Sequence, residues 1–237
     1  MTKMIAQIPG YNIETFRRLR KAIGWMGMSL PFVLVLLSVI PFFKTDIQQS
    51  ISRYYYTNLR EVFTGVLCAV SFFLILYKGV DNPVFWKNDN KMTSLAGIMA
   101  LGVAWVPTNP ADCCEKIYTL IPICAKVIGC LHYFIAGGFF FILAIISIVI
   151  FTIGQNQDMS LKVRLLNENN IYKTCGFAII FCIILIPICD ALNLFSSSTL
   201  ILEALALIAF GTSWLIKGRV LGDKGKVGMI LYREKNI

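Results

Sequence analysis

Six apolar runs limit what this chain can fold into more than any other feature of its sequence. A transmembrane helix needs about 20 mostly apolar residues. The runs cover residues 22–43, 62–77, 92–107, 127–154, 174–195 and 199–216. The second run is short, but it reaches full length as 54–77 if its helix begins near Tyr54 with Ser52 as the N-cap. Backbone groups in lipid must be paired within each segment, so we predict an all-α bundle of six transmembrane helices forming one membrane domain over residues 1–237.

Composition agrees with a membrane location. Only 15% of the residues are charged, against about 25% in a typical soluble domain. The net charge of +9 could suggest a nucleic-acid partner, but the Lys and Arg residues are unevenly placed. Seventeen of the 22 lie in residues 1–21, 78–91, 155–173 and 217–237, on one predicted side of the membrane. By the positive-inside rule both termini are cytoplasmic, which explains the charge without nucleic acid. The predicted location of the protein is the cell membrane, which is the inner membrane in a Gram-negative cell.

Two sequence features concern helix packing. Ala96, Ala100 and Ala104 repeat every four residues in the third run, and small residues on one face allow helices to approach closely. Pro31 and Pro187 fall inside predicted spans, where proline kinks a helix.

Ionisable side chains gather at one predicted depth. With this topology, five of them on four spans lie in the outer leaflet, and no comparable set lies at the inner ends of the spans. They are Arg60, Glu61, His132, Asp190 and Glu203. Such residues are costly in a membrane and usually face the bundle interior or a cavity. We therefore predict an outward-facing polar pocket, in which Arg60 contacts at least one of the acids, directly or through water.

The segment before the second span completes this predicted pocket with Ser52, Arg53 and Tyr56. The consecutive tyrosines Tyr54, Tyr55 and Tyr56 are expected at the level of the lipid headgroups. Each of the five ionisable residues in the spans also has a purely structural explanation: interfacial placement for Arg60 and Glu61, a hydrogen-bonded structural role for His132, capping for Asp190, and pairing with Arg60 for Glu203.

Six of the eight cysteines form two groups of three. Three fall in or beside the predicted outer loop between the third and fourth runs, which would face an oxidising periplasm in a bacterial inner-membrane protein. We expect Cys124 to form a disulfide with Cys113 or with Cys114. The second group repeats every seven residues in the fifth span and is expected to be buried as small apolar side chains. Its members are Cys175, Cys182 and Cys189.

Three functions fit the predicted pocket. The leading one is binding of a lipid headgroup or another amphiphile, because arginine recognises phosphate and tyrosine supplies amphipathic walls. An intramembrane lipid-processing hydrolase or transferase would use Ser50 or Ser52 as nucleophile with His132 as base. A proton-coupled transporter would use the buried carboxylates as proton carriers. One histidine makes a poor zinc site, so no metal and no cofactor are expected.

Several stretches carry a resemblance to known membrane proteins: SISRYYYTNLREVFTG, LILYKG, LHYFIAGGFFF and AFGTSWLIKG. Together they resemble a group of uncharacterised bacterial multi-pass proteins that is broadly similar to the six-helix DRAM/Frag1-type membrane families. The resemblance implies six helices with a serine-containing polar segment after the first one. It implies no particular chemistry. The intramembrane hydrolases that combine a serine with three histidines do not match, because this chain has one histidine.

Overall fold

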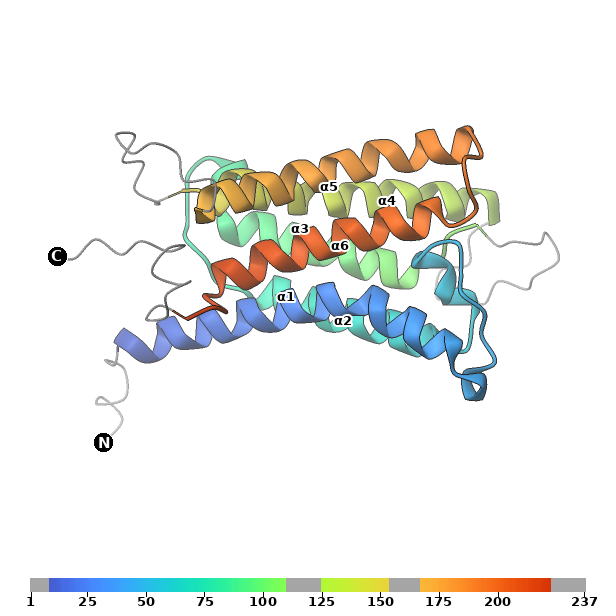
Figure 1. Cartoon of the computed structure of the whole chain (residues 1–237). Helices are drawn as coiled ribbons and strands as arrows, with labels where there is room; N and C mark the ends of the chain where they lie inside the picture. The colour runs from blue at the N-terminus through green and yellow to red at the C-terminus, as the bar shows by residue number, and fades with distance from the viewer. Residues whose placement is uncertain (1–8, 110–124, 154–166, 223–237) are drawn as a thin grey trace.

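The computed structural model describes residues 9–109, 125–153 and 167–222, and these segments form a bundle of long helices (Figure 1). The prediction of an all-α bundle is thereby confirmed for the described part of the chain. The long helices are α1 (Pro9–Val39), α2 (Arg60–Leu76), α3 (Asp89–Trp105), α4 (Ala125–Ile145), α5 (Glu168–Ala191) and α6 (Ser198–Lys217). Short helical turns are η1 (Pro41–Phe43), η2 (Ser52–Tyr56), η3 (Phe85–Lys87) and η4 (Ile146–Ile150), which continues α4.

The helices run alternately up and down and close into a ring. Each packs against its neighbours in sequence, and α6 also packs against α1 (Figure 1). The turn η2 marks one end of the bundle, which we call the η2 end. The opposite end, where α1 begins and α6 stops, we call the terminal end; there a Cβ on Gly218 would lie 3.1 Å from the carbonyl oxygen of Arg17.

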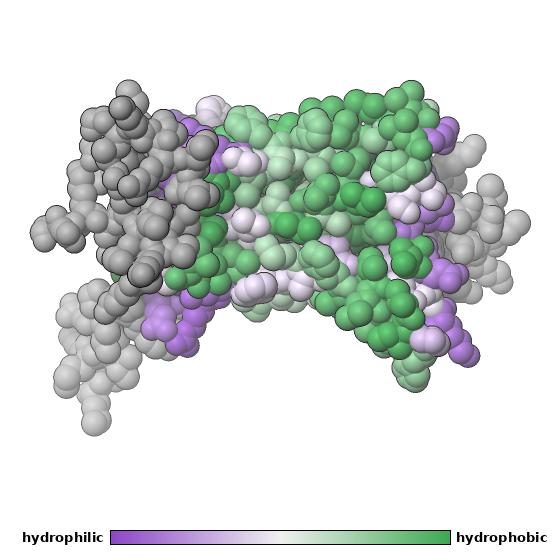
Figure 2. All heavy atoms as spheres, viewed as in Figure 1, coloured by the Kyte–Doolittle hydropathy of each residue, from purple (hydrophilic) through white to green (hydrophobic). Residues whose placement is uncertain are grey.

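The outer surface of the bundle suits a membrane. Four helical stretches are long and apolar enough to cross one: Ile13–Val39, Val127–Ile150, Glu168–Ala191 and Ser198–Lys217. Large apolar side chains such as Phe32 (59%), Phe134 (75%) and Phe181 (62%) are exposed on them. Figure 2 shows apolar residues across the middle of the visible face and hydrophilic residues towards both ends. The remaining two helices, α2 and α3, have 17 residues each.

Small residues bring the helices together. Ala96, Ala100 and Ala104 are all fully buried, which confirms the packing role predicted for them. A closer approach occurs between α1 and α6, where a Cβ on Gly211 would lie 2.6 Å from the carbonyl oxygen of Gly24. No side chain larger than hydrogen fits at that crossing without displacing one helix.

The cysteine stripe of α5 is buried, as predicted: Cys175, Cys182 and Cys189 are at most 9% exposed and are free thiols. Pro31 lies inside α1 and Pro187 inside α5, also as predicted. The proposed disulfide stays a prediction, because its cysteines lie outside the described residues. These are Cys113, Cys114 and Cys124.

The first helix begins earlier than the apolar pattern predicted. We expected the first span to start at residue 22, after a basic segment, but α1 already begins at Pro9. Within this extension Glu14 accepts a hydrogen bond from Nη2 of Arg18 at 2.6 Å, a pair with the i, i+4 spacing that stabilises an isolated helix. Hydrophobic runs mark the part of a helix that can lie in lipid, so they miss a polar extension of the same helix.

Candidate functional site

The segment between α1 and α2 is interrupted by a break at Thr57. This residue has an extended backbone (φ −117°, ψ 174°). Its hydroxyl donates to the carbonyl of Tyr54 at 2.9 Å and accepts from the N–H of Leu59 at 3.2 Å. Such local bonds compete with a continuing helix. The prediction of one helix starting near Tyr54 with Ser52 as its N-cap is therefore wrong, and α2 begins at Arg60.

The tyrosines of η2 are packed inside the protein rather than exposed as interfacial anchors. Tyr54 is 0% exposed and Tyr55 is 4% exposed, which corrects the expectation for these two. The phenol of Tyr54 shares a 2.8 Å hydrogen bond with the hydroxyl of Ser38 on α1. Tyr56 donates to the carbonyl of Thr108, beyond α3, at 2.6 Å. These contacts fix η2 against two neighbouring parts of the ring.

Arg60 and Glu61 lie in the first turn of α2 instead of two turns inside it. The guanidinium of Arg60 stacks 4.0 Å from the ring centre of Tyr55 and donates to its hydroxyl. Burial raises the pKa of this phenol, although the Arg60 charge opposes the rise. The predicted contact of Arg60 with Glu61, Asp190 or Glu203, directly or through water, stays a prediction, and the contacts that place Arg60 here are those with Tyr55. Glu61 is exposed, and its charge suits the N-terminus of a helix.

A cavity of about 830 Å³ lies at the η2 end, between η2, α4, α5 and the start of α6. Its size falls in the usual range for ligand pockets, about 300–1,000 Å³. Five of the eight predicted pocket residues line it: Ser52, Arg53, His132, Asp190 and Glu203. The other three lie outside its described lining: Tyr56, Arg60 and Glu61.

Glu203 holds the polar floor of this cavity in place. Its carboxylate accepts a 2.5 Å hydrogen bond from the backbone N–H of Ile51, at the start of η2. Just beside it, the N–H of Leu200 donates to the carbonyl of Gln49 at 2.9 Å. Two bonds therefore tie residues 49–51 to the first turns of α6, and Glu203 satisfies a backbone donor rather than an arginine.

His132 lines the cavity and has one ring nitrogen bonded to the backbone. The side chain is 2% exposed, and its Nδ1 lies 2.6 Å from the carbonyl oxygen of Val106. A carbonyl can only accept, so Nδ1 carries a proton. A neutral ring then has its lone pair on Nε2, which can accept a hydrogen bond from a hydroxyl, an amine or a phosphate monoanion.

Arg53 and Asp190 supply the charges nearest to solvent. Arg53 is half-buried and donates one bond, from Nη1 to the side-chain oxygen of Gln49 at 3.2 Å. Asp190 is exposed in the last turn of α5, where the helix dipole disfavours a carboxylate. Within the described residues its side chain has no hydrogen-bond or ion-pair partner. Both groups therefore retain capacity to bind a ligand.

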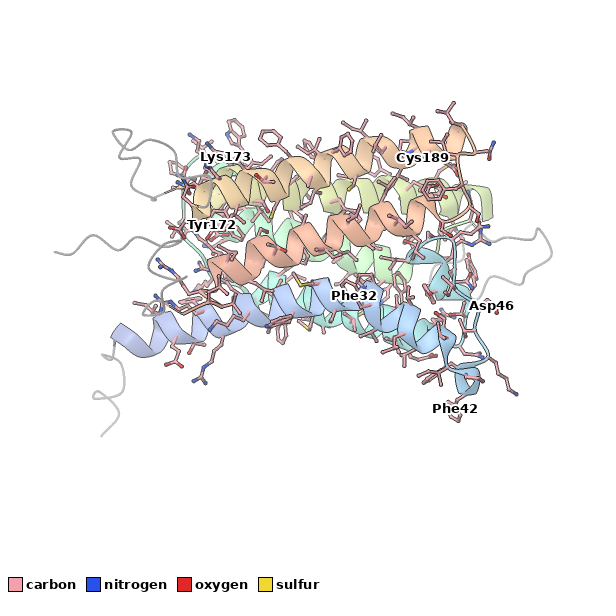
Figure 3. The ribbon with its side chains drawn as sticks, in the orientation of Figure 1. Phe32, Phe42, Asp46, Tyr172, Lys173 and Cys189 are labelled. Atoms are coloured by element: carbon pink, nitrogen blue, oxygen red, sulfur yellow. The ribbon has the colours of Figure 1, made fainter. Side chains whose placement is uncertain are left out.

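The rest of the lining is largely apolar, and we call this part the wall of the cavity. It consists of side chains from α4 and α5, while short polar residues around the start of α6 complete the rim. The wall contains Tyr133, Ala136, Phe140, Ile183, Ile186 and Pro187. Figure 3 shows Cys189, another lining residue, near this end of α5, and Tyr172 near its other end. The wall residues were missed because, in sequence, they resemble the lipid-facing residues of the same helices.

The catalytic alternatives receive less geometric support. Ser50 and Ser52 do line the cavity with His132, but in the described part of the chain no hydrogen bond joins either hydroxyl to the imidazole. The Ser50 hydroxyl instead accepts from the N–H of Arg53 at 3.2 Å. No three His, Cys, Asp or Glu side chains among the described residues are grouped so as to hold a metal ion.

Comparison with protein-family models, with curated proteins and with solved structures finds no match to this chain. The resemblance to DRAM/Frag1-type proteins consequently stays a prediction, and the functional argument depends on the geometry of the bundle.

Proposed function

We propose that the cavity at the η2 end binds the polar headgroup of a membrane lipid or of another amphiphile. The observation that carries this proposal is that one cavity is lined both by polar residues, its floor, and by apolar side chains, its wall. Arg53, His132 and Asp190 line the floor, and α4 and α5 form the wall. A ligand with a charged head and an alkyl chain matches both halves.

The chemistry of the floor indicates what the head should carry. A guanidinium recognises a phosphate oxygen through charge-assisted hydrogen bonds, so Arg53 would bind a phosphate. Asp190 would accept from an ammonium or a hydroxyl group, and Nε2 of His132 from a further hydroxyl. A zwitterionic phospholipid head contains both a phosphate and an ammonium and would use the two charges together.

The membrane placement is part of the same proposal. We propose that α2 and α3 also span the membrane, that both termini are cytoplasmic and that the cavity opens in the outer leaflet. A 17-residue helix is about 25 Å long, close to the 30 Å hydrocarbon core. Exposed apolar side chains on these two helices support spanning: Phe72, Leu76, Ile98 and Trp105. The charge distribution supports the orientation.

A lipid hydrolase or transferase is the second candidate, because Ser52 and His132 share the cavity. An enzyme of this kind would release a product from the bound lipid, whereas a binding protein would leave the lipid intact. A transporter is less favoured. The buried residues of α6 between Glu203 and Lys217 are apolar apart from Ser213, which leaves little for a proton path.

A headgroup comparison tests the proposal. The protein in an alkyl maltoside should gain thermal stability on titration with an alkyl phosphocholine of equal chain length. Arg53→Gln should weaken this effect about tenfold or more, the usual value of a charge-assisted bond. Lys44→Gln is the matched control, because Lys44 is an exposed cation outside the described lining. Equal responses to both amphiphiles, or equal losses in both variants, would contradict it.

A further inference from the structure

A second cavity, of about 490 Å³, lies at the terminal end of the bundle. Five cationic side chains line it, against two acidic ones. The cations are Arg17, Arg20, Lys78, Lys217 and Arg219, and the acids are Asp81 and Glu168. The sequence pattern did not indicate this cavity, because all seven residues lie just outside the predicted spans. These charged residues flank the apolar runs. In the sequence, the lysines and arginines among them served only to predict which side of the membrane each loop faces.

Arg20 is held in a fixed orientation. Its Nε and Nη2 donate to the hydroxyl of Tyr77 at 2.9 Å and 2.5 Å, and that hydroxyl donates in turn to Oδ2 of Asp89 at 3.1 Å. A guanidinium has five N–H donors, so this arrangement leaves three of them for other partners. Tyr77 is 2% exposed, which makes the orienting group part of the core.

Lys217 is positioned by aromatic rings and a carbonyl. Its ammonium donates to the backbone oxygen of Phe151 at 2.8 Å and lies 5.5 Å from the ring centres of both Phe151 and Tyr172. Cation–π contacts of this kind stabilise a partly desolvated charge. Two of the three ammonium donors remain for a ligand.

The acids of this cavity accept hydrogen bonds from neutral side chains. Asp81 accepts from the side-chain amides of Asn90 at 2.6 Å and Asn88 at 3.4 Å. Glu168 accepts from the hydroxyl of Tyr172 at 3.3 Å. Neither Arg20 nor Lys217 forms a salt bridge with any carboxylate that the structure describes. Two oriented cations thus face a cavity of excess positive charge without a direct salt bridge among the described residues, although Asp89 and Glu168 lie near enough for their charges to act on Lys217.

We infer that the cavity at the terminal end binds a phosphate group, with Arg20 and Lys217 as its principal donors. Arginine offers a planar fork to phosphate and lysine a compact charge, and the pair is common at phosphate sites. The phosphate can come from a soluble polyphosphate ester or from the phosphomonoester head of an anionic lipid. This site is separate from the η2-end cavity, and α6 runs between them.

The test uses the full-length protein in nanodiscs of phosphatidylcholine, titrated with pyrophosphate in a calorimeter. A second set of nanodiscs contains phosphatidic acid, and lipid retained after transfer to detergent is measured by mass spectrometry. Arg20→Gln and Lys217→Gln should each weaken binding about tenfold or more. Arg18→Gln is the control, because the Arg18 side chain is 76% exposed and pairs with Glu14 on the same helix.

Each result decides the question. Pyrophosphate binding that is lost in the two variants but kept in Arg18→Gln supports a soluble phosphate ligand. Selective retention of phosphatidic acid with the same variant pattern supports a lipid ligand. Binding of neither probe, or equal weakening in the control, overturns the inference. If Arg20→Gln or Lys217→Gln fails to fold, Lys78→Gln replaces it, since Lys78 is exposed and lines the cavity. Unchanged affinity in Lys78→Gln then counts against the site.

Arg53→Gln distinguishes this site from the proposed lipid site. It should leave phosphate binding at the terminal end unaltered, whatever its effect at the η2 end.

Discussion

The carboxylate of Glu203 on α6 accepts a hydrogen bond from the backbone N–H of Ile51, a residue 152 positions earlier in the chain, at 2.5 Å. This bond joins the polar segment after α1 to the first turns of α6. It thereby closes one side of the cavity that contains Arg53 and His132. An acid that would be costly within an apolar helix has a clear structural use here.

Removing this acceptor should loosen the η2 end. We expect Glu203→Ala to lower the free energy of unfolding by about 1–3 kcal/mol, because a part-buried N–H loses its partner. Glu203→Gln keeps an acceptor oxygen of similar reach and should lose less. Unfolding in detergent, followed by tryptophan fluorescence, measures both. Wild-type stability in the alanine variant would show that the bond does not hold the segment.

The crossing of α1 and α6 gives a packing prediction. In Gly211→Ala the new methyl group would lie 2.6 Å from the carbonyl of Gly24 and from Cβ of Met28, so one helix must shift. Such overpacking costs about 1–3 kcal/mol. Gly65→Ala on α2 is the matched control: no atom lies within 4 Å of its added Cβ, and alanine favours a helix by up to about 1 kcal/mol. The thermal midpoints of the two variants should move in opposite directions.

Tyr77, just past the end of α2, gives a pH prediction. Burial, with a further contribution from the charge of Asp89, raises its pKa to about 12, against an ordinary value of about 10. The folded state thus favours the neutral phenol. Its contribution to stability is complete below about pH 10 and is lost as the pH rises towards 12. Spectrophotometric titration should find a phenol that ionises near pH 12 and disappears in Tyr77→Phe. Ionisation of every tyrosine near pH 10 would contradict this environment.

The same substitution should also affect stability at neutral pH. In Tyr77→Phe, Arg20 loses its orienting acceptor and Asp89 loses a donor. We expect a loss of about 1–3 kcal/mol in the free energy of unfolding, since both partners are left less satisfied. Tyr133→Phe is a suitable control, because Tyr133 is 55% exposed. Equal midpoints for the two variants would show that the buried hydroxyl contributes nothing.

Membrane orientation can be tested with single cysteines in a cysteine-free background. Positions in residues 44–49 should react with an impermeant thiol reagent added outside the cell, and positions in residues 155–159 should react only after permeabilisation. The expectation follows from the 17 Lys and Arg residues on one predicted side and five on the other. The reverse labelling pattern would move the Arg53 cavity to the cytoplasmic leaflet.

The sequence predicts the elements of this fold better than their ends. Apolar runs locate all six long helices, and the alanine repeat of α3 identifies a buried face correctly. The start of α2 could not be predicted, because it depends on the two hydrogen bonds of the Thr57 hydroxyl. The same break explains why Arg60 stacks on Tyr55 instead of entering the cavity.

The candidate site shows a similar division. Depth along the helices was enough to place His132, Asp190 and Glu203 around one cavity. Their hydrogen-bond partners are backbone groups of distant segments, such as Val106 and Ile51, and nothing in a side-chain pattern specifies these. The terminal-end cavity was missed for a related reason. Arg20 and Lys217 are oriented by aromatic residues and a carbonyl that are distant in sequence, and these contacts cannot be read from the sequence pattern.

Photochemical labelling in the membrane tests the central proposal most directly. A phospholipid with a photoreactive group in its head should label residues 49–53 and 190–199, whereas a probe with that group in its acyl chain should label the wall around Phe140 and Ile183. Arg53→Gln should reduce labelling by the head probe, and Lys44→Gln should not. Labelling spread evenly over the exposed apolar side chains, such as Phe134 and Phe181, with no enrichment at the cavity would contradict a bound amphiphile.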